Sequence, residues 1–247
     1  MRKPLMGTGI TRTPPEAPKI AFTRLPAGAD DLILEVQQVK IGIDEADEKA
    51  ALARVRELAA KRPNEYYSRL ALARAECAIG ERAAGEKILK VLLDERPEDL
   101  EALQVMAYSR LAAARGADYD DAKAAYAEAV KYLGRAHKVD PDNYLTLYGY
   151  AEARSFDREP TANTLEVIFR AAEIVPQNPS IRMNAAEMFI RAGQYATARR
   201  MLAPVAANPH GGGPARMAAE TLKTLEGKED KPVQPAATKA STGKPAG

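Results

Sequence analysis

The chain has 247 residues, of which 46% are hydrophobic and 6% aromatic, and its formal net charge at pH 7 is +2. A balance this close to zero implies no general attraction to phosphate backbones or acidic membranes, so the sequence predicts neither a nucleic-acid nor a membrane partner. Cys77 is the only cysteine, which excludes an internal disulfide, and no run of about 18 apolar residues could form a transmembrane helix. The first residues are basic but lack the apolar core of a signal peptide, so we expect a cytoplasmic protein.

Residues 1–29 are rich in proline and are expected to form an extended or disordered segment. Prolines between Pro4 and Pro26 forbid a regular helix here. Residues 19–24 (KIAFTR) alternate like a short strand, but one strand without a partner is unstable. This piece either lies along the surface of the domain that follows or pairs with a domain outside the present sequence.

Residues 30–226 are predicted to form one helical repeat domain made of about five pairs of amphipathic helices. In the first pair, a helix over 32–41 begins after a side-chain cap from Asp30 or Asp31. A second helix covers about 45–61. This pair fits the later pattern poorly in its leading helix, as is usual for a terminal repeat that meets water on one side.

The third pair is ten residues longer than the second, which spans Pro63–Arg96. Seven of the added residues fall inside its second helix, where they add about two turns and keep the buried face in register. The pattern therefore predicts a helix from about Asp118 to Lys138 that projects beyond its neighbours. Such a projection marks either a docking surface or a lengthened helix without a role.

The fourth pair begins with an aromatic-rich helix at Tyr144, and Thr161 can cap its second helix. The fifth pair occupies residues 177–209. Its turn contains Gly193, which can take the left-handed conformation that ends a helix.

One further helix is expected over Pro214–Leu225, where it would cover the apolar side of the fifth pair. Residues 227–247 are rich in lysine, proline, alanine and threonine and carry almost no large apolar side chain. We therefore predict a disordered C-terminal tail over these residues.

Prolines close the successive pairs at intervals of 34, 44, 35 and 33 residues; they are Pro63, Pro97, Pro141, Pro176 and Pro209. A period of about 34 residues with one helical hairpin per unit is typical of tetratricopeptide repeats (TPRs), and the sequence resembles that family over roughly residues 31–226. The positions that look like the family's turn glycine, aromatic, small residue and packing pair are Gly193-Gln194-Tyr195, Ala198, Leu202 and Val205. Earlier units match at Leu72-Ala73, Gly80, Leu89 and Asp118-Tyr119-Asp120-Asp121-Ala122. The chain departs from the family in having no tryptophan.

This resemblance implies an all-α, right-handed α-solenoid of TPR-like hairpins with a C-terminal capping helix. It also implies a concave groove, lined by the leading helices, that binds a peptide or a helix of a partner protein. The residues expected to line it are Tyr67, Arg74, Gln104, Tyr108, Tyr148, Glu152, Asn184 and Glu187. Leu70 and Met183 belong either to the groove or to the core between helices. Because Glu152 and Glu187 would repel a carboxylate, a partner's terminal carboxylate is disfavoured as the ligand.

Chemistry-bearing motifs are not found in the sequence. His137 and His210 are the only histidines, and neither has the spacing of a metal site. His137 falls late in a predicted helix, where a partial positive charge suits the helix dipole. Cys77 has no histidine nearby in sequence and reads as a small packing residue. We therefore expect no catalytic residue, metal or cofactor, and a protein that is not an enzyme.

A second hypothesis comes from residues 202–212, which look like the closing repeat of certain larger bacterial proteins. Those proteins carry a zinc-peptidase-like domain in front of a TPR tail. The strand-like residues 19–24 would then be the trailing edge of that domain, and the chain would present partners or substrates to an enzyme in the periplasm or outside the cell. No catalytic motif of such a domain is present, so no catalytic residue is carried over. Weak self-association through the ends of the array or the long third-unit helix is left open.

Overall fold

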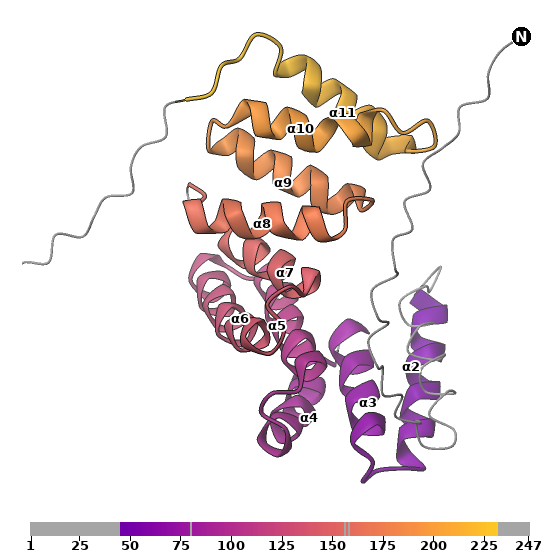
Figure 1. The fold of residues 1–247 in the computed structure, drawn as a ribbon. Coiled ribbons are helices and arrows are strands. Elements are labelled where there is room, and N and C mark those ends of the chain that lie inside the picture. Colours follow the sequence, from indigo (N-terminus) through magenta and orange to yellow (C-terminus); the bar gives the residue numbers. More distant parts are fainter. Residues whose placement is uncertain (1–44, 80, 156, 158, 232–247) are drawn as a thin grey trace, which may run out of the picture.

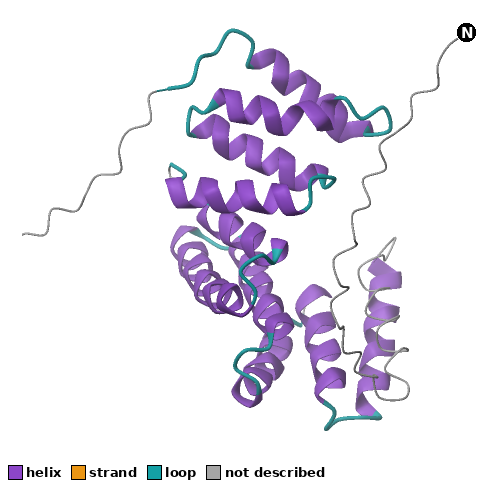
Figure 2. Cartoon of the chain, viewed as in Figure 1, coloured by secondary structure: helices purple, strands orange, loops and turns teal. Residues whose placement is uncertain are grey.

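The computed structural model describes residues 45–79, 81–155, 157 and 159–231. Over these residues the chain forms helices joined by short loops, without a strand (Figure 2). The helices are α2 (Glu45–Ala60), α3 (Tyr66–Ile79), α4 (Arg82–Glu95), α5 (Leu100–Ala114), α6 (Tyr119–Val139), α7 (Tyr144–Arg154), α8 (Ala162–Ile174), α9 (Pro179–Arg191), α10 (Tyr195–Ala206) and α11 (Gly212–Thr224). The predicted segment 1–29, its strand-like piece and the helix at 32–41 lie outside the described residues.

Consecutive helices form the hairpins α3–α4, α5–α6, α7–α8 and α9–α10, and each hairpin packs on the next. Figure 1 shows them stacked into an elongated array that begins at α2 and ends at α11. First helices of neighbouring hairpins also touch in the first part of the array, where α3 contacts α5 and α5 contacts α7. This arrangement confirms the predicted all-α solenoid of helical hairpins.

Side-chain caps fix where α5, α6, α7, α8 and α9 begin. The capping residues, each accepting a hydrogen bond from a backbone N–H two or three positions later, are Asp99 (α5), Asp118 (α6), Asn143 (α7), Thr161 (α8) and Asn178 (α9). Such caps satisfy N–H groups that have no partner inside the helix. At the other end of α9, Gly193 has φ +74° and the next residue, Gln194, donates its N–H to the carbonyl of Phe189 at 2.8 Å. The helix therefore ends at the predicted glycine turn.

Helix α6 has 21 residues, whereas α4 has 14 and α8 has 13. Its bounds, Tyr119–Val139, lie within one residue of those predicted from the insertion. Ala122, Ala129, Leu133 and Ala136 are all buried along one face of this helix. The added turns thus keep the packing stripe, and the prediction of a lengthened helix is confirmed.

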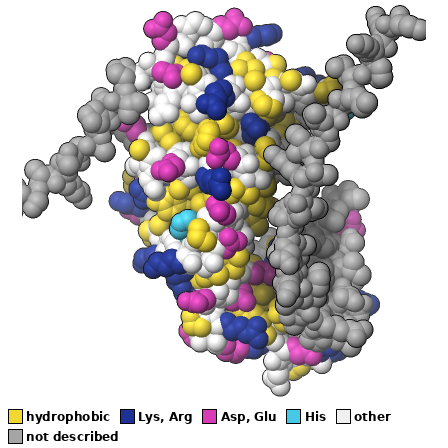
Figure 3. Space-filling model, in the orientation of Figure 1, with side chains coloured by type: hydrophobic (Ala, Val, Ile, Leu, Met, Phe, Trp, Pro, Cys, Tyr) yellow, Lys and Arg dark blue, Asp and Glu magenta, His cyan; other side chains and the backbone are white. Residues whose placement is uncertain are grey.

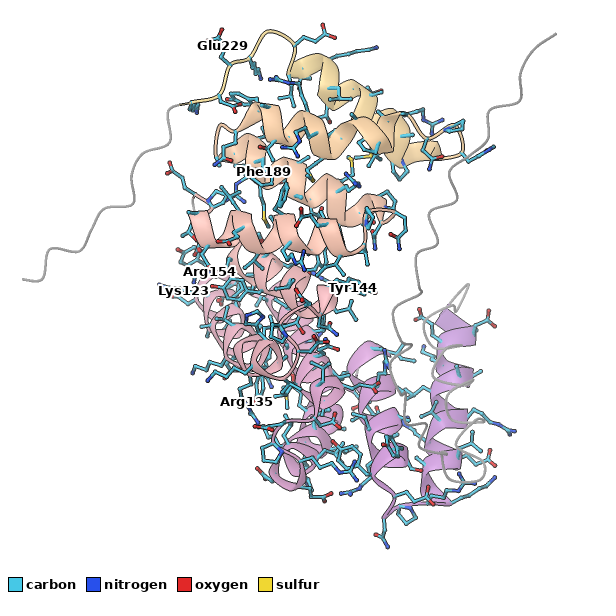
Figure 4. All side chains as sticks on the ribbon, in the orientation of Figure 1. Lys123, Arg135, Tyr144, Arg154, Phe189 and Glu229 are labelled. Atoms are coloured by element: carbon cyan, nitrogen blue, oxygen red, sulfur yellow. The ribbon has the colours of Figure 1, made fainter. Side chains whose placement is uncertain are left out.

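Small side chains dominate the core. Many alanines are fully buried at the helix contacts, among them Ala73, Ala107, Ala151 and Ala185, and leucines fill the larger spaces between helices. Aromatic contacts are few: Phe189, labelled in Figure 4, meets Phe169 edge-on with the ring centroids 6.3 Å apart. Alanines at these positions let neighbouring helices approach closely, which is consistent with the low aromatic content.

The C-terminal helix α11 packs on α10 and α9 as predicted, with Ala218 and Leu225 buried against them. The chain then folds back over the start of α10. Asp230 Oδ1 accepts a hydrogen bond from the backbone N–H of Ala196 at 2.7 Å, and Lys231 N donates to the carbonyl of Gly193 at 2.9 Å. Gln194, the residue before α10, provides no side-chain cap of its own.

The packed chain therefore continues past the predicted boundary at residue 226, at least as far as Lys231. We call residues 225–231 the C-terminal strap. Residues 232–247 lie outside the described part of the chain. Among the described helices, none is both long enough and apolar enough to cross a membrane.

Candidate interaction surface

The predicted groove residues come from the first helices of four consecutive hairpins, α3, α5, α7 and α9. The caps Asp99, Asn143 and Asn178 set these helices in a common register. Tyr108, Glu152 and Glu187 each lie nine positions after the cap of their helix. Arg74 lies at the equivalent position of α3, and Gln104 and Tyr148 lie one helical turn before this position in α5 and α7. We call this surface the leading-helix face; it consists of Tyr67, Arg74, Gln104, Tyr108, Tyr148, Glu152, Asn184 and Glu187.

Gln104 connects the second and third of these helices. Its Nε2 donates to Asn143 Oδ1 at 2.7 Å and to Thr146 Oγ1 at 2.9 Å. Asn143 Oδ1 also accepts the backbone N–H of Thr146, so the same oxygen caps α7 and receives the bond from α5. The amide of Gln104 therefore holds the start of α7 against α5.

Two tyrosines make equivalent connections. The Tyr108 hydroxyl donates to the backbone carbonyl of Leu145 at 2.9 Å, and the Tyr148 hydroxyl accepts a hydrogen bond from Asn184 Nδ2. Burial, together with the nearby Glu152 carboxylate, raises the pKa of both tyrosines. Both hydroxyls are therefore neutral at physiological pH.

The charged residues of the face are mostly paired. Arg74 forms an ion pair with Glu101 of the next first helix, and Arg115 at the end of α5 pairs with Glu152 on α7. The hydrogen bond to Glu152 raises the pKa of Arg115. Glu187 is exposed and forms no hydrogen bond or ion pair with the described residues. Basic and acidic side chains are interspersed over the surface seen in Figure 3.

Tyr67 is the most exposed aromatic residue of the face, with 45% of its surface accessible. Its ring packs edge-on against that of Tyr66, with the centroids 5.8 Å apart, and the Arg96 guanidinium lies 6.0 Å from it. Leu70 is buried, so it belongs to the core, whereas Met183 is half-buried at the edge of the core.

The structure thus brings the predicted residues onto one side of the first helices but divides them into two groups. Arg74, Gln104, Tyr108, Tyr148, Glu152 and Asn184 bond to a neighbouring hairpin, as described above. Tyr67 and Glu187 make no such bond and present their side chains outward. The face is a braced framework that carries a few accessible groups.

Sequence reasoning missed several residues that belong to this surface. Asn143 serves α5 and α7 at once, and the only sequence signal for it is its place directly before a helix. Leu145 is 38% exposed on α7. Arg191 of α9 donates to the backbone carbonyls of Ser155 and Asp157 after α7, at 3.2 and 2.5 Å. No local pattern identifies a contact of this kind because its partner lies one hairpin away.

Groups that could carry chemistry are sparse among the described residues. No cluster of three or more His, Cys, Asp and Glu side chains in this part of the chain is arranged to hold a metal ion. Cys77 is half-buried, and burial raises the pKa of its thiol. A thiol with a raised pKa is a weak nucleophile at neutral pH.

No protein-family model matches the chain, and no curated protein sequence matches it. Its structure is similar to several solved structures. The TPR protein TTC0263 of Thermus thermophilus is 20% identical, with a TM-score of 0.63 over 78% of this chain and 98% of that one. PilF of Pseudomonas aeruginosa is 16% identical, with a TM-score of 0.57 over 81% of this chain and 94% of that one. MamA of Desulfovibrio magneticus is 15% identical, with a TM-score of 0.53 over 82% and 99%.

At these identities the comparison shows the fold alone. The described helices form a TPR-like all-α solenoid, as the proline spacing and the turn residues predicted.

Proposed function

We propose that this TPR-like array is a non-catalytic scaffold whose leading-helix face binds a peptide or a helix of a partner protein. The observation that carries the proposal is the bracing of that face by side-chain bonds between hairpins. Gln104, Tyr108 and Tyr148 are held in place by hydrogen bonds within the array itself. A surface that is ordered before binding loses little side-chain entropy when a partner docks.

The accessible groups suit such a partner. Tyr67 offers an exposed ring, Leu145 an exposed apolar side chain, and Glu187 an exposed carboxylate that is not paired within the described residues. Tyrosines are frequent in binding hot spots because they combine a large contact area with a polar tip. Glu187 makes a partner's terminal carboxylate an unfavourable ligand, since two like charges repel.

The test compares the wild-type protein with a Tyr67→Ala, Glu187→Arg variant in a pull-down from native extract. These two side chains make no bond to a neighbouring hairpin, so the variant is expected to fold, which circular dichroism checks. A matched control carries Lys123→Glu and Glu166→Arg at exposed positions of α6 and α8. The proposal expects a partner that the control retains and the face variant loses.

Equal capture by all three proteins would show that the partner does not use this face. Light scattering on the same samples reports whether the array self-associates. A concentration-dependent dimer that the face variant abolishes would make a second copy the partner.

The alternative is that this chain is the partner-presenting TPR tail of a larger zinc-peptidase-like enzyme, and it rests on residues 202–212. These residues form the end of α10, the loop after it and the start of α11. The genomic sequence upstream of Met1 tests this alternative, because it predicts an in-frame H-E-x-x-H helix there. A stop codon directly upstream would contradict it. The two hypotheses also differ in the compartment they predict, cytoplasmic for the scaffold and periplasmic or exported for the enzyme tail.

A further inference from the structure

A pocket of about 240 Å³ lies between α6, α7 and α8, away from the leading-helix face. Its lining residues are Leu133, Gly134 and His137 of α6, Thr146, Leu147 and Tyr150 of α7, and Asn163 and Val167 of α8. The lining residues of α7 are buried or half-buried, whereas the exposed ones, Gly134, His137 and Asn163, belong to α6 and α8. The pocket therefore opens on the surface formed by the second helices of the hairpins. We call it the α6–α8 pocket.

Gly134 lies in the interior of α6, where glycine costs the helix about 1 kcal/mol relative to alanine. Packing explains two other helical glycines. A Cβ on Gly85 would lie 2.6 Å from Cys77 Sγ, and one on Gly149 would lie 3.1 Å from Leu133 Cδ2. A Cβ on Gly134 would meet no described atom within 4 Å. No packing contact with the described residues therefore requires glycine at 134, a position that lines the pocket.

The lining combines an apolar floor with a polar rim. Leu133 and Leu147 are buried at the bottom, with Val167 half-buried beside them. At the rim, Asn163 Nδ2 donates to the Tyr150 hydroxyl at 3.2 Å, which leaves the Asn163 carbonyl oxygen as an acceptor and the Tyr150 hydroxyl hydrogen as a donor. His137 forms no hydrogen bond or ion pair with the described residues. The rim can thus both donate and accept hydrogen bonds.

Size and charge limit what fits. Sites for drug-sized ligands and cofactors usually measure about 300–1,000 Å³, so this pocket suits a smaller group, equal to roughly eight water volumes. No aspartate, glutamate, lysine or arginine lines it, so a charged group would lose its hydration without gaining a counter-charge. An aromatic side chain with a polar tip meets both conditions, because its ring fills the apolar floor and its tip reaches the rim.

We propose that the α6–α8 pocket binds a tyrosine or tryptophan side chain of a partner protein. The site is independent of the leading-helix face, so either proposal can fail without the other. A partner anchored here approaches the exposed lining residues of the second helices, Gly134, His137 and Asn163, and contacts none of the eight residues that define the leading-helix face.

The chain contains no tryptophan, so the fluorescence of a tryptophan probe reports binding without background. N-acetyl-tryptophanamide is titrated with the full chain. A saturable blue shift of the indole emission is expected, with a Kd on the order of 0.1–1 mM for so small a ligand. N-acetyl-tyrosinamide should compete, and N-acetyl-lysinamide should not. A signal that does not saturate, or equal competition by the lysine compound, would overturn the proposal.

The variant Gly134→Leu adds a large side chain to a residue that lines the pocket and is expected to weaken probe binding at least tenfold. Leucine favours a helix more than glycine does, and no described atom crowds the new Cβ, so the variant should fold. Ala127→Leu, at an exposed position of the same helix outside the pocket, is the matched control. Unchanged binding to Gly134→Leu would show that the probe binds elsewhere.

A second probe tests whether the pocket accepts an aromatic side chain that is part of a polypeptide. This probe is an acetylated, amidated pentapeptide that has tryptophan at its centre and glycine and serine on both sides. The proposal expects this peptide to bind at least as tightly as the single amino-acid amide. If the amide bound and the peptide did not, the pocket would accept a free small molecule, and a protein partner would be contradicted.

Discussion

On the leading-helix face, the Gln104 amide donates two hydrogen bonds across the boundary between hairpins, to Asn143 and Thr146. At the rim of the α6–α8 pocket, the Asn163 amide makes one hydrogen bond, to Tyr150 within its own hairpin, and its carbonyl oxygen receives none from the described residues. The difference shows that an amide side chain in this array can either join two hairpins or keep part of its hydrogen-bonding capacity for a ligand. The groove residues that were predicted from helix register alone include side chains that join two hairpins and side chains that make no such bond.

Removing an apolar side chain shared by core and pocket should have the largest effect. Leu133 is fully buried between α5, α6 and α7, so Leu133→Ala should lower the free energy of unfolding by about 3 kcal/mol. Leu145→Ala, at an exposed position of the leading-helix face, should change it by less than about 1 kcal/mol. Urea unfolding followed by circular dichroism measures both. Similar losses for the two variants would contradict the assignment of Leu133 to the core.

The next effect tests whether the face is braced. Gln104→Ala removes both hydrogen bonds between the hairpins and leaves the buried Thr146 hydroxyl without its donor. We therefore expect the free energy of unfolding to fall by about 2 kcal/mol. Glu187→Ala removes a side chain that makes no bond to the described residues, so its free energy of unfolding should stay within about 0.5 kcal/mol of the wild-type value. If both variants unfolded at the same urea concentration, the bonds from Gln104 would carry no stability.

Alkaline pH should expose the part played by the buried tyrosines. Their pKa values are raised in the folded state, so the neutral hydroxyl is favoured there. The contribution of these two tyrosines to stability should therefore be constant below about pH 10, the pKa of an unfolded tyrosine, and should fall as the pH rises above it. Tyr108→Phe removes the hydrogen bond to the Leu145 carbonyl and should lower the free energy of unfolding by about 1 kcal/mol at pH 7. The variant should also show a shallower loss above pH 10 than wild type in thermal melts, and an equally steep loss would contradict this assignment.

The smallest effect has the opposite sign. Gly134→Ala should raise the free energy of unfolding by about 0.8 kcal/mol, because alanine is the better helix former and no described atom lies within 4 Å of the new Cβ. Gly149→Ala should lower the free energy of unfolding, because its Cβ would press on Leu133 and Tyr108. Differential scanning calorimetry distinguishes the two directions. Destabilisation by Gly134→Ala would mean that packing does require this glycine.

Much of the fold was predictable because its signals are local. The proline spacing indicated the hairpins, the seven-residue insertion predicted the length of α6, and Thr161 and Gly193 marked a helix start and a helix end. The helix start and end depend on residues within one or two helical turns, whereas the hairpins and the length of α6 followed from comparing successive repeats along the sequence. The helix start at Gly212, two residues before the predicted Pro214, is a small exception.

The functional surfaces were less predictable because they depend on how hairpins stack. Register placed Gln104 on the leading-helix face, but its bond to Thr146, 42 residues away, follows from the geometry of two packed hairpins. The α6–α8 pocket needs three helices at once, and sequence reasoning gave His137 only a role at the end of a helix. No sequence pattern marks Gly134 as a pocket residue, because only the structure shows that no described atom lies within 4 Å of a Cβ at this position.

The C-terminal strap has a practical consequence for anyone who shortens or tags this protein. Composition alone suggests a cut after residue 226, yet that cut would remove the Asp230 carboxylate that caps α10. In a linear repeat array the last unit has a neighbour on one side only, so fraying begins there when its closure is lost. Expression vectors should therefore keep the chain through Lys231 and attach any affinity handle beyond it.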